Sequence, residues 1–480
     1  MNRDFFRPLL ILSLAAILVG LIAMIIPQWE NDVFPIRKMH WFSKLFESRS
    51  QEDSLNVAIE TIEHIPSALD PFLMRLGSLP VLSGQTGLVE NQLGARSRKL
   101  RIAYFSDSTI EGDLITAPLR YEFQKVYGGT GVGMMPITSI VSGFRQTIRH
   151  SFSKNWESIS FMSPVNKNLS LGITGYTFIP RPYYSVTTKV EKADTLAIAD
   201  SLLTELVADS TEVKPSTQRH YVDHNAWVEY KAVDISGGAG SFANIRLFYS
   251  NASDSSKVYV SYESSASQSY HLSSRQGVQV LDISPGSPVK SVRLEFLRDD
   301  PIHVYGVSFD APKGVYVDNF PIRGYSGMYF SRIHENVLRD FQSYLKYDLI
   351  VLQYGENVSN PANRDYSNYK NAMIRTVEHI HKSMPKVPVL IVSAHDRSIK
   401  DGGSYKTSPD IPILVKTQAE LARETDSAFF NLFEAMGGYN SMQGLVQQKP
   451  PLASSDYTHF NRRGADWVAK LLLSFLTGDA

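Results

Sequence analysis

The sequence predicts an α/β protein with a parallel sheet, interrupted by an inserted antiparallel β-sandwich and preceded by one N-terminal transmembrane helix. Three observations predict this arrangement. Strand-like and helix-like patterns alternate near residue 100 and again after residue 314, short runs of period two fill the region between them, and residues 9–26 carry no charge. Strand–helix alternation is typical of α/β sheets, and many short strands separated by turn signals are typical of sandwiches.

Composition narrows the class of protein. The chain has 480 residues, of which 43% are hydrophobic and 20% charged, as expected for two or three globular domains. Lysine plus arginine equals aspartate plus glutamate at 48 each, so no global field attracts nucleic acid and we expect no such partner. The chain has no cysteine, which excludes disulfides, thiol catalysis and thiolate metal sites.

The N-terminal segment predicts a membrane anchor. Residues 9–26 read LLILSLAAILVGLIAMII, long enough to cross most of a ~30 Å hydrocarbon core. Arg3 and Arg7 precede it and favour a cytoplasmic N-terminus, although Arg37 and Lys38 follow it. The alternative is a cleaved signal peptide, but no convincing cleavage site follows. We expect an anchor at 1–27 in the cell inner membrane, a juxtamembrane region at 28–98, and the remainder on the periplasmic side.

The α/β elements follow in order along the chain. A strand at 101–105 leads into a helix near 115–127 that ends at a glycine pair. After residue 314 the patterns predict strands at 314–320, 348–355, 387–394 and 428–433, and helices at 335–346, 367–384 and 464–476. The economical interpretation is one discontinuous α/β domain, 99–150 plus 314–477, interrupted by a β-sandwich at 155–312, since an insertion whose ends lie close together is well tolerated.

Two features of the central region have alternative interpretations. The aromatic side chains of the insertion either stack on sugar rings or, as is more common, form core and cross-strand pairs; they include Trp227, Tyr230, Tyr249 and Tyr262. The glycine cluster GGTGVG at 128–133 follows a helix and lacks a Gly-Lys-Ser/Thr ending, which favours a tight loop over a phosphate loop. Residues 191–217 are acidic and rich in serine and threonine, as in a surface excursion.

Polar residues follow the predicted strands, where α/β sheets bind their ligands. They occur at three places, Ser106–Ser108, Gly324 and Gly355–Asn357, and the Asp456/His459 pair lies near the start of the C-terminal helix. Each has a structural alternative: Ser108 as a helix N-cap, Gly324 as a turn glycine, Asn357 as a loop residue, and Asp456 with His459 as a cap and a surface histidine. Together they supply a hydroxyl nucleophile, a base with a carboxylate, and oxyanion donors. His395, which also follows a strand, is the alternative histidine.

These residues, in this order, resemble the four sequence blocks of the SGNH (GDSL-type) hydrolases. The resemblance covers about 99–150 and 314–477. The G-D-S block is matched by Asp107 and Ser108, the N-x-G-x-x-G block by Asn319 and Gly324, the G-x-N-D block by Gly355 and Asn357, and the D-x-x-H block by Asp456 and His459. The sequence departs from the blocks at Ser106, Pro321 and Val358, which stand where the family has glycine, glycine and aspartate.

The resemblance implies a three-layer, flavodoxin-like fold and a serine-hydrolase site. In the family's terms Ser108 is the nucleophile, His459 the base and Asp456 the residue that orients it. The backbone N–H groups of Ser108 and Gly324, with the Asn357 side chain, form the oxyanion hole. No metal or cofactor is required.

The resemblance also implies a substrate class. Peptidoglycan O-acetylesterases of this family carry a carbohydrate-binding-like sandwich between the first two blocks, so the architecture is similar to theirs. It implies a serine esterase acting on acetyl esters of cell-envelope glycan. The stretches DSTIEGDLIT, NLFEAMGG and HFNRRGA resemble envelope members from Bacteroidetes that often accompany a membrane-bound O-acyltransferase. An O-acetyltransferase acting on an envelope polysaccharide and a non-catalytic glycan-binding protein are the alternatives.

Overall fold

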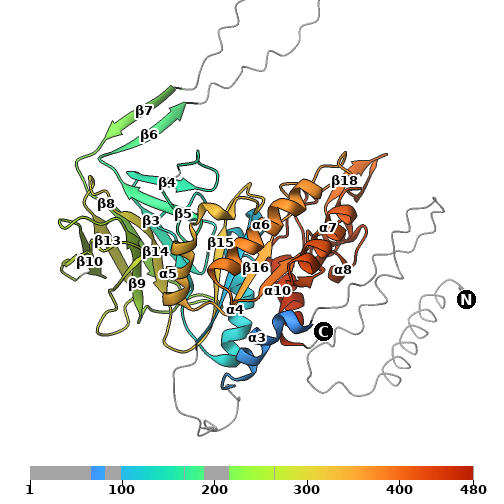
Figure 1. Ribbon diagram of the computed structural model, residues 1–480, viewed down its shortest axis with the longest axis horizontal. Helices are drawn as coiled ribbons and strands as arrows, with labels where there is room; N and C mark the ends of the chain where they lie inside the picture. The colour runs from blue at the N-terminus through green and yellow to red at the C-terminus, as the bar shows by residue number, and fades with distance from the viewer. Residues whose placement is uncertain (1–65, 82–98, 167, 189–215, 264, 479–480) are drawn as a thin grey trace, which may run out of the picture. The chain divides into compact units, whose positions relative to one another are not determined.

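The computed structural model describes residues 66–81, 99–166, 168–188, 216–263 and 265–478 (Figure 1). The predicted anchor at 9–26 and most of the acidic stretch at 191–217 lie outside these residues. Among the helices that the structure describes, none combines the length and apolarity needed to span a bilayer.

A five-stranded parallel sheet forms the centre of the α/β part. Its strand order is β15-β1-β16-β17-β20. β15, the second strand of this sheet in chain order, therefore lies at the edge, beside the first strand β1. This is the flavodoxin-like order 2-1-3-4-5. The mixed α/β fold predicted from the sequence is thereby confirmed. The strands are β1 (Lys99–Ser106), β15 (Gly314–Pro321), β16 (Leu349–Gln353), β17 (Val389–Val392) and β20 (Ala428–Phe430).

Helices cover both faces of this sheet because its strands are apolar on both sides. In β1, Ala103 and Phe105 point into one core, whereas Ile102 and Tyr104 point into the other. The first core is closed by α5 (Glu335–Leu345), α6 (Ser367–Ser383) and α7 (Ile411–Glu424). The second is closed by α3 (Pro66–Gly77), α4 (Thr116–Tyr127), α9 (Ser441–Gln447) and α10 (Arg462–Thr477). The short elements are η2 (Ser108–Asp113), η3 (Phe330–Arg332), α8 (Leu432–Ala435), and the hairpin of β18 (Ser398–Asp401) and β19 (Ser404–Thr407).

Two antiparallel sheets form the insertion. Their strand orders are β11-β10-β13-β8-β3 and β12-β9-β14-β5-β4, with β2 added alongside β14, and a separate apolar core lies within the insertion. A further hairpin pairs β6 with β7. The strands are β2 (Gly133–Met135), β3 (Ile148–Phe152), β4 (Trp156–Ser160), β5 (Tyr176–Pro180), β6 (Tyr183–Thr188), β7 (Ser216–Tyr221), β8 (Ala226–Ala232), β9 (Ile245–Ser250), β10 (Lys257–Tyr262), β11 (Gln268–His271), β12 (Gln279–Asp282), β13 (Ser291–Phe296) and β14 (His303–Phe309).

Two predicted boundaries differ from the structure. The insertion begins earlier than residue 155, because β2 and β3 pair with its strands β14 and β8. The three residues of β2 are too few to show a period, and the buried His150 conceals the alternation in β3. The region 28–98 is also not all juxtamembrane, since α3 packs Leu69 and Phe72 into the α/β core.

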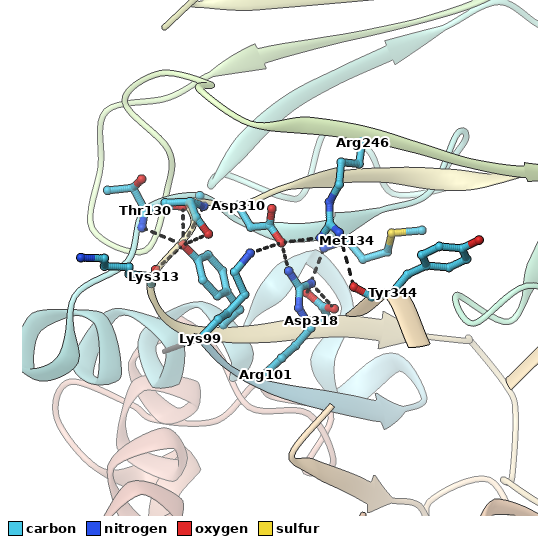
Figure 2. A network of polar contacts seen from close by, with 12 residues as sticks. Lys99, Arg101, Thr130, Met134, Arg246, Asp310, Lys313, Asp318 and Tyr344 are labelled. Carbon is cyan, nitrogen blue, oxygen red and sulfur yellow. Dashed lines mark hydrogen bonds and ion pairs between the residues drawn. The ribbon is translucent and has the colours of Figure 1, made fainter. Parts of the chain in front are cut away.

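A buried ionic network joins the central sheet to the insertion (Figure 2). Arg101 of β1 has no exposed surface and donates from Nη1 to both Asp318 carboxylate oxygens, at 2.7 and 3.0 Å. Its other amino group pairs with Asp310, just after β14. Asp310 Oδ2 also forms ion pairs with Lys99 Nζ at 3.0 Å and with Arg246 Nη2 at 3.1 Å. Because Arg246 belongs to β9, one carboxylate ties the first strand of the sheet to the insertion.

Candidate active site

The nucleophile loop begins where β1 ends. Asp107 caps η2, because its Oδ1 accepts hydrogen bonds from the backbone N–H of Thr109 at 2.9 Å and from the Thr109 hydroxyl at 2.7 Å. Ser108 is the first residue of η2 and is partly exposed. The cap is therefore Asp107, and the Ser108 hydroxyl is not used for this purpose.

The Asp456–His459 turn presents an aspartate–histidine pair. Asp456 Oδ1 accepts hydrogen bonds from the backbone N–H groups of Thr458 and His459, both at 3.0 Å, and Oδ2 lies 2.7 Å from His459 Nδ1. Burial raises the pKa of Asp456, but the hydrogen bonds from His459 and Thr458 outweigh it and hold the pKa below its usual range. Asp456 is therefore ionised at neutral pH and fixes the orientation of the imidazole.

The serine and the histidine meet across the sheet edge. His459 Nε2 lies 3.4 Å from Ser108 Oγ, although the two residues are 351 positions apart in the chain. This distance is long for a hydrogen bond, as is common for catalytic contacts in ligand-free sites. The side chains of Asp456 and His459 are about half exposed, at 49% and 48%. The structure thus brings together Ser108, His459 and Asp456 in the order that a nucleophile, a base and its orienting carboxylate require.

Gly324 lies in the loop after β15, beside the nucleophile loop. Ser106 and Pro321 are register partners in the parallel β1–β15 pair, and the N–H of Ile322 donates to the carbonyl of Ser106 at 2.9 Å. Gly324 has a φ of 74°, which favours glycine, and an added Cβ would approach only Met162 Cε, at 3.8 Å. The backbone conformation and not crowding therefore explains the glycine.

Asn357 links the two loops. Its Nδ2 donates to Asp107 Oδ2 at 2.7 Å and to the carbonyl oxygen of Tyr325 at 3.2 Å. The amide thus connects the residue before Ser108 to the residue after Gly324. Both of its hydrogens have acceptors here, so its part in an oxyanion hole stays a prediction.

The three departures from the family blocks fit the structure. Ser106 is buried and donates its hydroxyl to the carbonyl of Gln353 at 2.6 Å. Pro321 ends β15, the edge strand of the sheet, where no ladder donor is lost. Val358 packs against the apolar core on one face of the sheet. None of them displaces Asp107, Ser108 or Asn357 from the arrangement described.

Comparison with known proteins shows which fold this is. No protein-family model and no curated protein matches the sequence. Among solved structures, a peptidoglycan O-acetylesterase superposes with a TM-score of 0.56 at 20% sequence identity, over 80% of this chain and 92% of that one. The chain has the fold of that esterase. The fold that the resemblance implied is thereby confirmed.

Two other solved structures are similar at lower scores. An acetyl xylan esterase covers 34% of this chain and 81% of its own at 19% identity, with a TM-score of 0.27. A family two carbohydrate esterase from Cellvibrio japonicus covers 53% and 90% at 9% identity, with a TM-score of 0.23. At these scores neither adds to the argument.

The two ring nitrogens of the alternative histidine, His395, face partners other than Ser108. His395 is buried, its Nε2 lies 2.8 Å from the carbonyl oxygen of Thr458, and its Nδ1 lies 3.2 Å from Glu356 Oε1. Burial lowers the pKa of His395. Burial, with the nearby negative charge of Asp107, raises the pKa of Glu356 to about 8. A neutral histidine beside a protonated carboxyl group therefore lies beneath the Asp456–His459 turn.

An ion pair that no sequence pattern indicated joins the two loops again. Arg323 Nε lies 3.0 Å from Glu111 Oε1, and its Nη2 pairs with Oε2. Arg323 directly precedes Gly324, and Glu111 belongs to η2, which Ser108 begins. In the sequence, the two residues are marked only by their nearness to candidate site residues, since Arg323 lies one position from Gly324 and Glu111 three positions from Ser108.

The insertion also borders the site. Its Phe161 ring stacks on Tyr325 at 4.4 Å between centroids, and Arg332 of η3 donates to the carbonyl oxygens of Phe161 and Ser163 at 2.6 and 2.9 Å. The loop that carries Met162 therefore lies beside Gly324. The residues that the structure describes include no group of three or more His, Asp or Glu side chains arranged to hold a metal.

The aromatic residues proposed for sugar stacking separate into two groups. Tyr230 and Tyr249 are buried in the core of the insertion, so they are core residues. Tyr262 is partly exposed and donates its hydroxyl to the carbonyl of Ile283 at 2.5 Å. Trp227 is also partly exposed, but the Arg293 guanidinium lies over its ring at 3.9 Å. The structure thus removes two of the four from a sugar platform.

Proposed function

We propose that the chain is a serine esterase that cleaves acetyl esters of a cell-envelope glycan through an acyl-enzyme. The observation that carries the proposal is the continuous contact from Ser108 Oγ to His459 Nε2 and from His459 Nδ1 to the Asp456 carboxylate. The fold shared with a peptidoglycan O-acetylesterase supports the same reaction class.

Ser108, His459 and Asp456 have distinct roles in the proposed reaction. Ser108 Oγ attacks the ester carbonyl while His459 Nε2 takes its proton, and ionised Asp456 stabilises the imidazolium that forms. His459 then returns the proton to the departing sugar oxygen, which leaves an acetyl ester on Ser108. A water molecule, deprotonated by His459, then attacks this ester, and His459 passes that proton to Ser108 Oγ as the ester bond breaks and acetate leaves.

The negative charge of the tetrahedral intermediate needs nearby donors. The N–H groups of Ser108 and Gly324 belong to two loops that Asn357 and the Arg323–Glu111 pair hold together. They are the proposed oxyanion donors, with the Asn357 amide as a third if it leaves one of its present acceptors. Removing one such donor lowers kcat by about 10²–10³.

A glycan substrate at the membrane fits the remaining features. We propose that residues 9–26 anchor the chain in the inner membrane and that its active site faces the periplasm, where it acts on acetylated envelope glycan. The half-exposed Asp456 and His459 side chains leave the base open to a large substrate. The same openness favours a second candidate, an O-acetyltransferase in which a glycan hydroxyl replaces water and a membrane-bound O-acyltransferase supplies the acetyl group.

The test is an assay of residues 66–480 or the full chain with p-nitrophenyl acetate and acetylated glycans, beside Ser108→Ala. We expect a burst of p-nitrophenol and release of acetate that Ser108→Ala abolishes. Acetyl groups that appear on an added glycan before free acetate would identify the transferase. Equal activity of the wild type and Ser108→Ala would refute the site, and a glycan that binds without turnover would favour a non-catalytic protein.

A further inference from the structure

The β18–β19 hairpin and the residues before it make three contacts with the Asp456–His459 turn. His395 Nε2 lies 2.8 Å from the carbonyl oxygen of Thr458. The N–H of Ser398 donates to the carbonyl oxygen of Tyr457 at 3.0 Å. The ring of Tyr405 stacks on that of Tyr457, with 3.5 Å between centroids and 6° between planes. The middle of the turn is thus held by its backbone and by a side chain.

The turn needs such support because its backbone is strained. Tyr457 has a φ of 56°, a left-handed conformation that is unfavourable for a residue with a Cβ. This conformation directs the N–H groups of Thr458 and His459 to Asp456 Oδ1, which leaves Oδ2 for His459 Nδ1. The half-exposed Asp456 and His459 side chains have little packing of their own to preserve it.

The hairpin is itself anchored to the α/β body on its other side. The N–H of Thr407 donates to Asn440 Oδ1 at 3.1 Å, and the N–H of Asn440 donates to Thr407 Oγ1 at 2.6 Å. Before the hairpin, Asp396 Oδ2 accepts the N–H of Met442, in α9, at 2.8 Å. The hairpin therefore connects α9 to the turn that carries His459.

We propose that Tyr405 is a positioning residue for the Asp456–His459 pair: its ring holds Tyr457 in the left-handed conformation that aims His459 at Ser108. The catalytic consequence rests on the proposed function, whereas the geometric consequence does not. Tyr405 contacts Tyr457 and not Ser108. Loss of the Tyr405 ring is therefore expected to change the position of His459 more than the binding of a small ester.

The experiment compares Tyr405→Ala and Tyr405→Phe with the wild type and with Tyr184→Ala as matched control. Tyr184 is likewise a stacked tyrosine in a two-stranded hairpin, on His220 at 5.1 Å, but it belongs to the β6–β7 hairpin of the insertion. Two readouts are taken: kcat and KM for p-nitrophenyl acetate, and the far-downfield proton resonance of His459 Nδ1–H, assigned by its loss in His459→Asn. The melting temperature of each variant shows that it is folded.

We expect Tyr405→Ala to lower kcat by about 10- to 100-fold with KM within about twofold, since small displacements of a catalytic group have effects of this size. We also expect its downfield resonance to broaden or disappear, while Tyr405→Phe and Tyr184→Ala keep both. Wild-type kcat and an unchanged resonance in Tyr405→Ala would overturn the proposal. A wild type no more active than Ser108→Ala would overturn the proposed function, and a resonance lost only in Tyr405→Ala would then still support the positioning role.

Discussion

Arg323 and Glu111 form a two-point ion pair between the loop of Gly324 and the loop of Ser108. The pair spans 212 residues of sequence, and the Glu111 side chain is only 7% exposed. Because both proposed backbone donors lie within three residues of it, we expect the pair to hold the two loops that carry these donors at a fixed separation. A largely buried carboxylate has a large desolvation cost when its partner is removed.

Breaking this pair is expected to affect turnover more than substrate binding. Glu111→Gln should lower kcat about tenfold, since a shift of the Gly324 loop weakens a donor used mainly in the transition state. Arg323→Lys should have a smaller effect because it keeps the charge but loses one of two contacts. The measurement is kcat and KM for p-nitrophenyl acetate. Arg339→Lys is the control, because the Arg339 side chain is exposed and its partner Glu335 lies in the same helix; equal kcat in all variants would argue against the coupling.

Gly324→Ala is expected to lower kcat about 100-fold. An alanine at a φ of 74° is unfavourable by roughly 1–2 kcal/mol, so the loop relaxes and the N–H turns away from the oxyanion. Gly444→Ala is the matched control, because Gly444 lies within α9 with open space around it and alanine favours helices. Normal turnover in Gly324→Ala would remove this N–H from the mechanism.

Asp456→Asn is expected to lower kcat by about 10⁴ at neutral pH. The amide keeps the size of the side chain but cannot accept the Nδ1 proton with the same charge, so the imidazole loses its orientation and the stabilisation of its cation. Single-turnover kinetics with p-nitrophenyl acetate would measure the acylation step directly. Retention of most activity would assign the orienting role to another residue.

Glu356 is expected to make stability depend on pH. Its pKa of about 8 in the folded protein lies above the ordinary value of 4.5, so the folded state binds a proton that the unfolded state lacks between these values. The stabilisation from this extra proton is fully present below pH 4.5 and is lost as the pH rises through about 8. Between these values the free energy of unfolding falls by about 1.4 kcal/mol for each pH unit. Urea unfolding from pH 5 to pH 9 should show a fall that Glu356→Gln reduces. A parallel fall in the variant would assign the dependence to other groups.

Removing Arg101 is expected to destabilise the protein by about 3–5 kcal/mol, because buried Asp318 would lose its ion-pair partner and Asp310 would lose one of three cations. Arg101→Met, which keeps much of the volume, tests this by urea unfolding. Arg75→Met is the matched control: its pair with Asp348 is 2.9 Å long but the arginine is 55% exposed, so a loss of about 0–1 kcal/mol is expected. Similar losses for both would contradict a structural role for the buried network.

The parts of the fold predicted from sequence are those with unbroken local patterns. The strand at 349–353 is apolar over its first four residues, and α5 places Val337, Leu338 and Phe341 on one side, so both were predictable from local pattern. Ser108 and Gly324 were predictable as neighbours because parallel strands deliver their carboxyl ends to one edge. The Asp456/His459 pair lies near the start of the C-terminal helix, so only the resemblance to the family's sequence blocks placed it with them.

The supports of the site were not predictable in this way. Arg323 and Glu111 find each other across two loops, and a charged residue in a loop gives no sign of its partner. The β18–β19 hairpin, Ser398–Thr407, has no long apolar alternation, and contacts such as those with Tyr457 and Asn440 fix its place. Tertiary contact rather than local pattern decides such elements.

The place of the insertion has a consequence for the order of folding. Strands β1 and β15 are hydrogen-bonded neighbours, yet roughly 200 residues separate them in the chain, so pairing them first would close a very long loop. The pairing of β2 with β14 brings the beginning and end of the insertion together. A sandwich that folds first therefore shortens the effective loop before the central sheet assembles. In that order of events Ser108 and Gly324 come together late, after the domain inserted between them has formed.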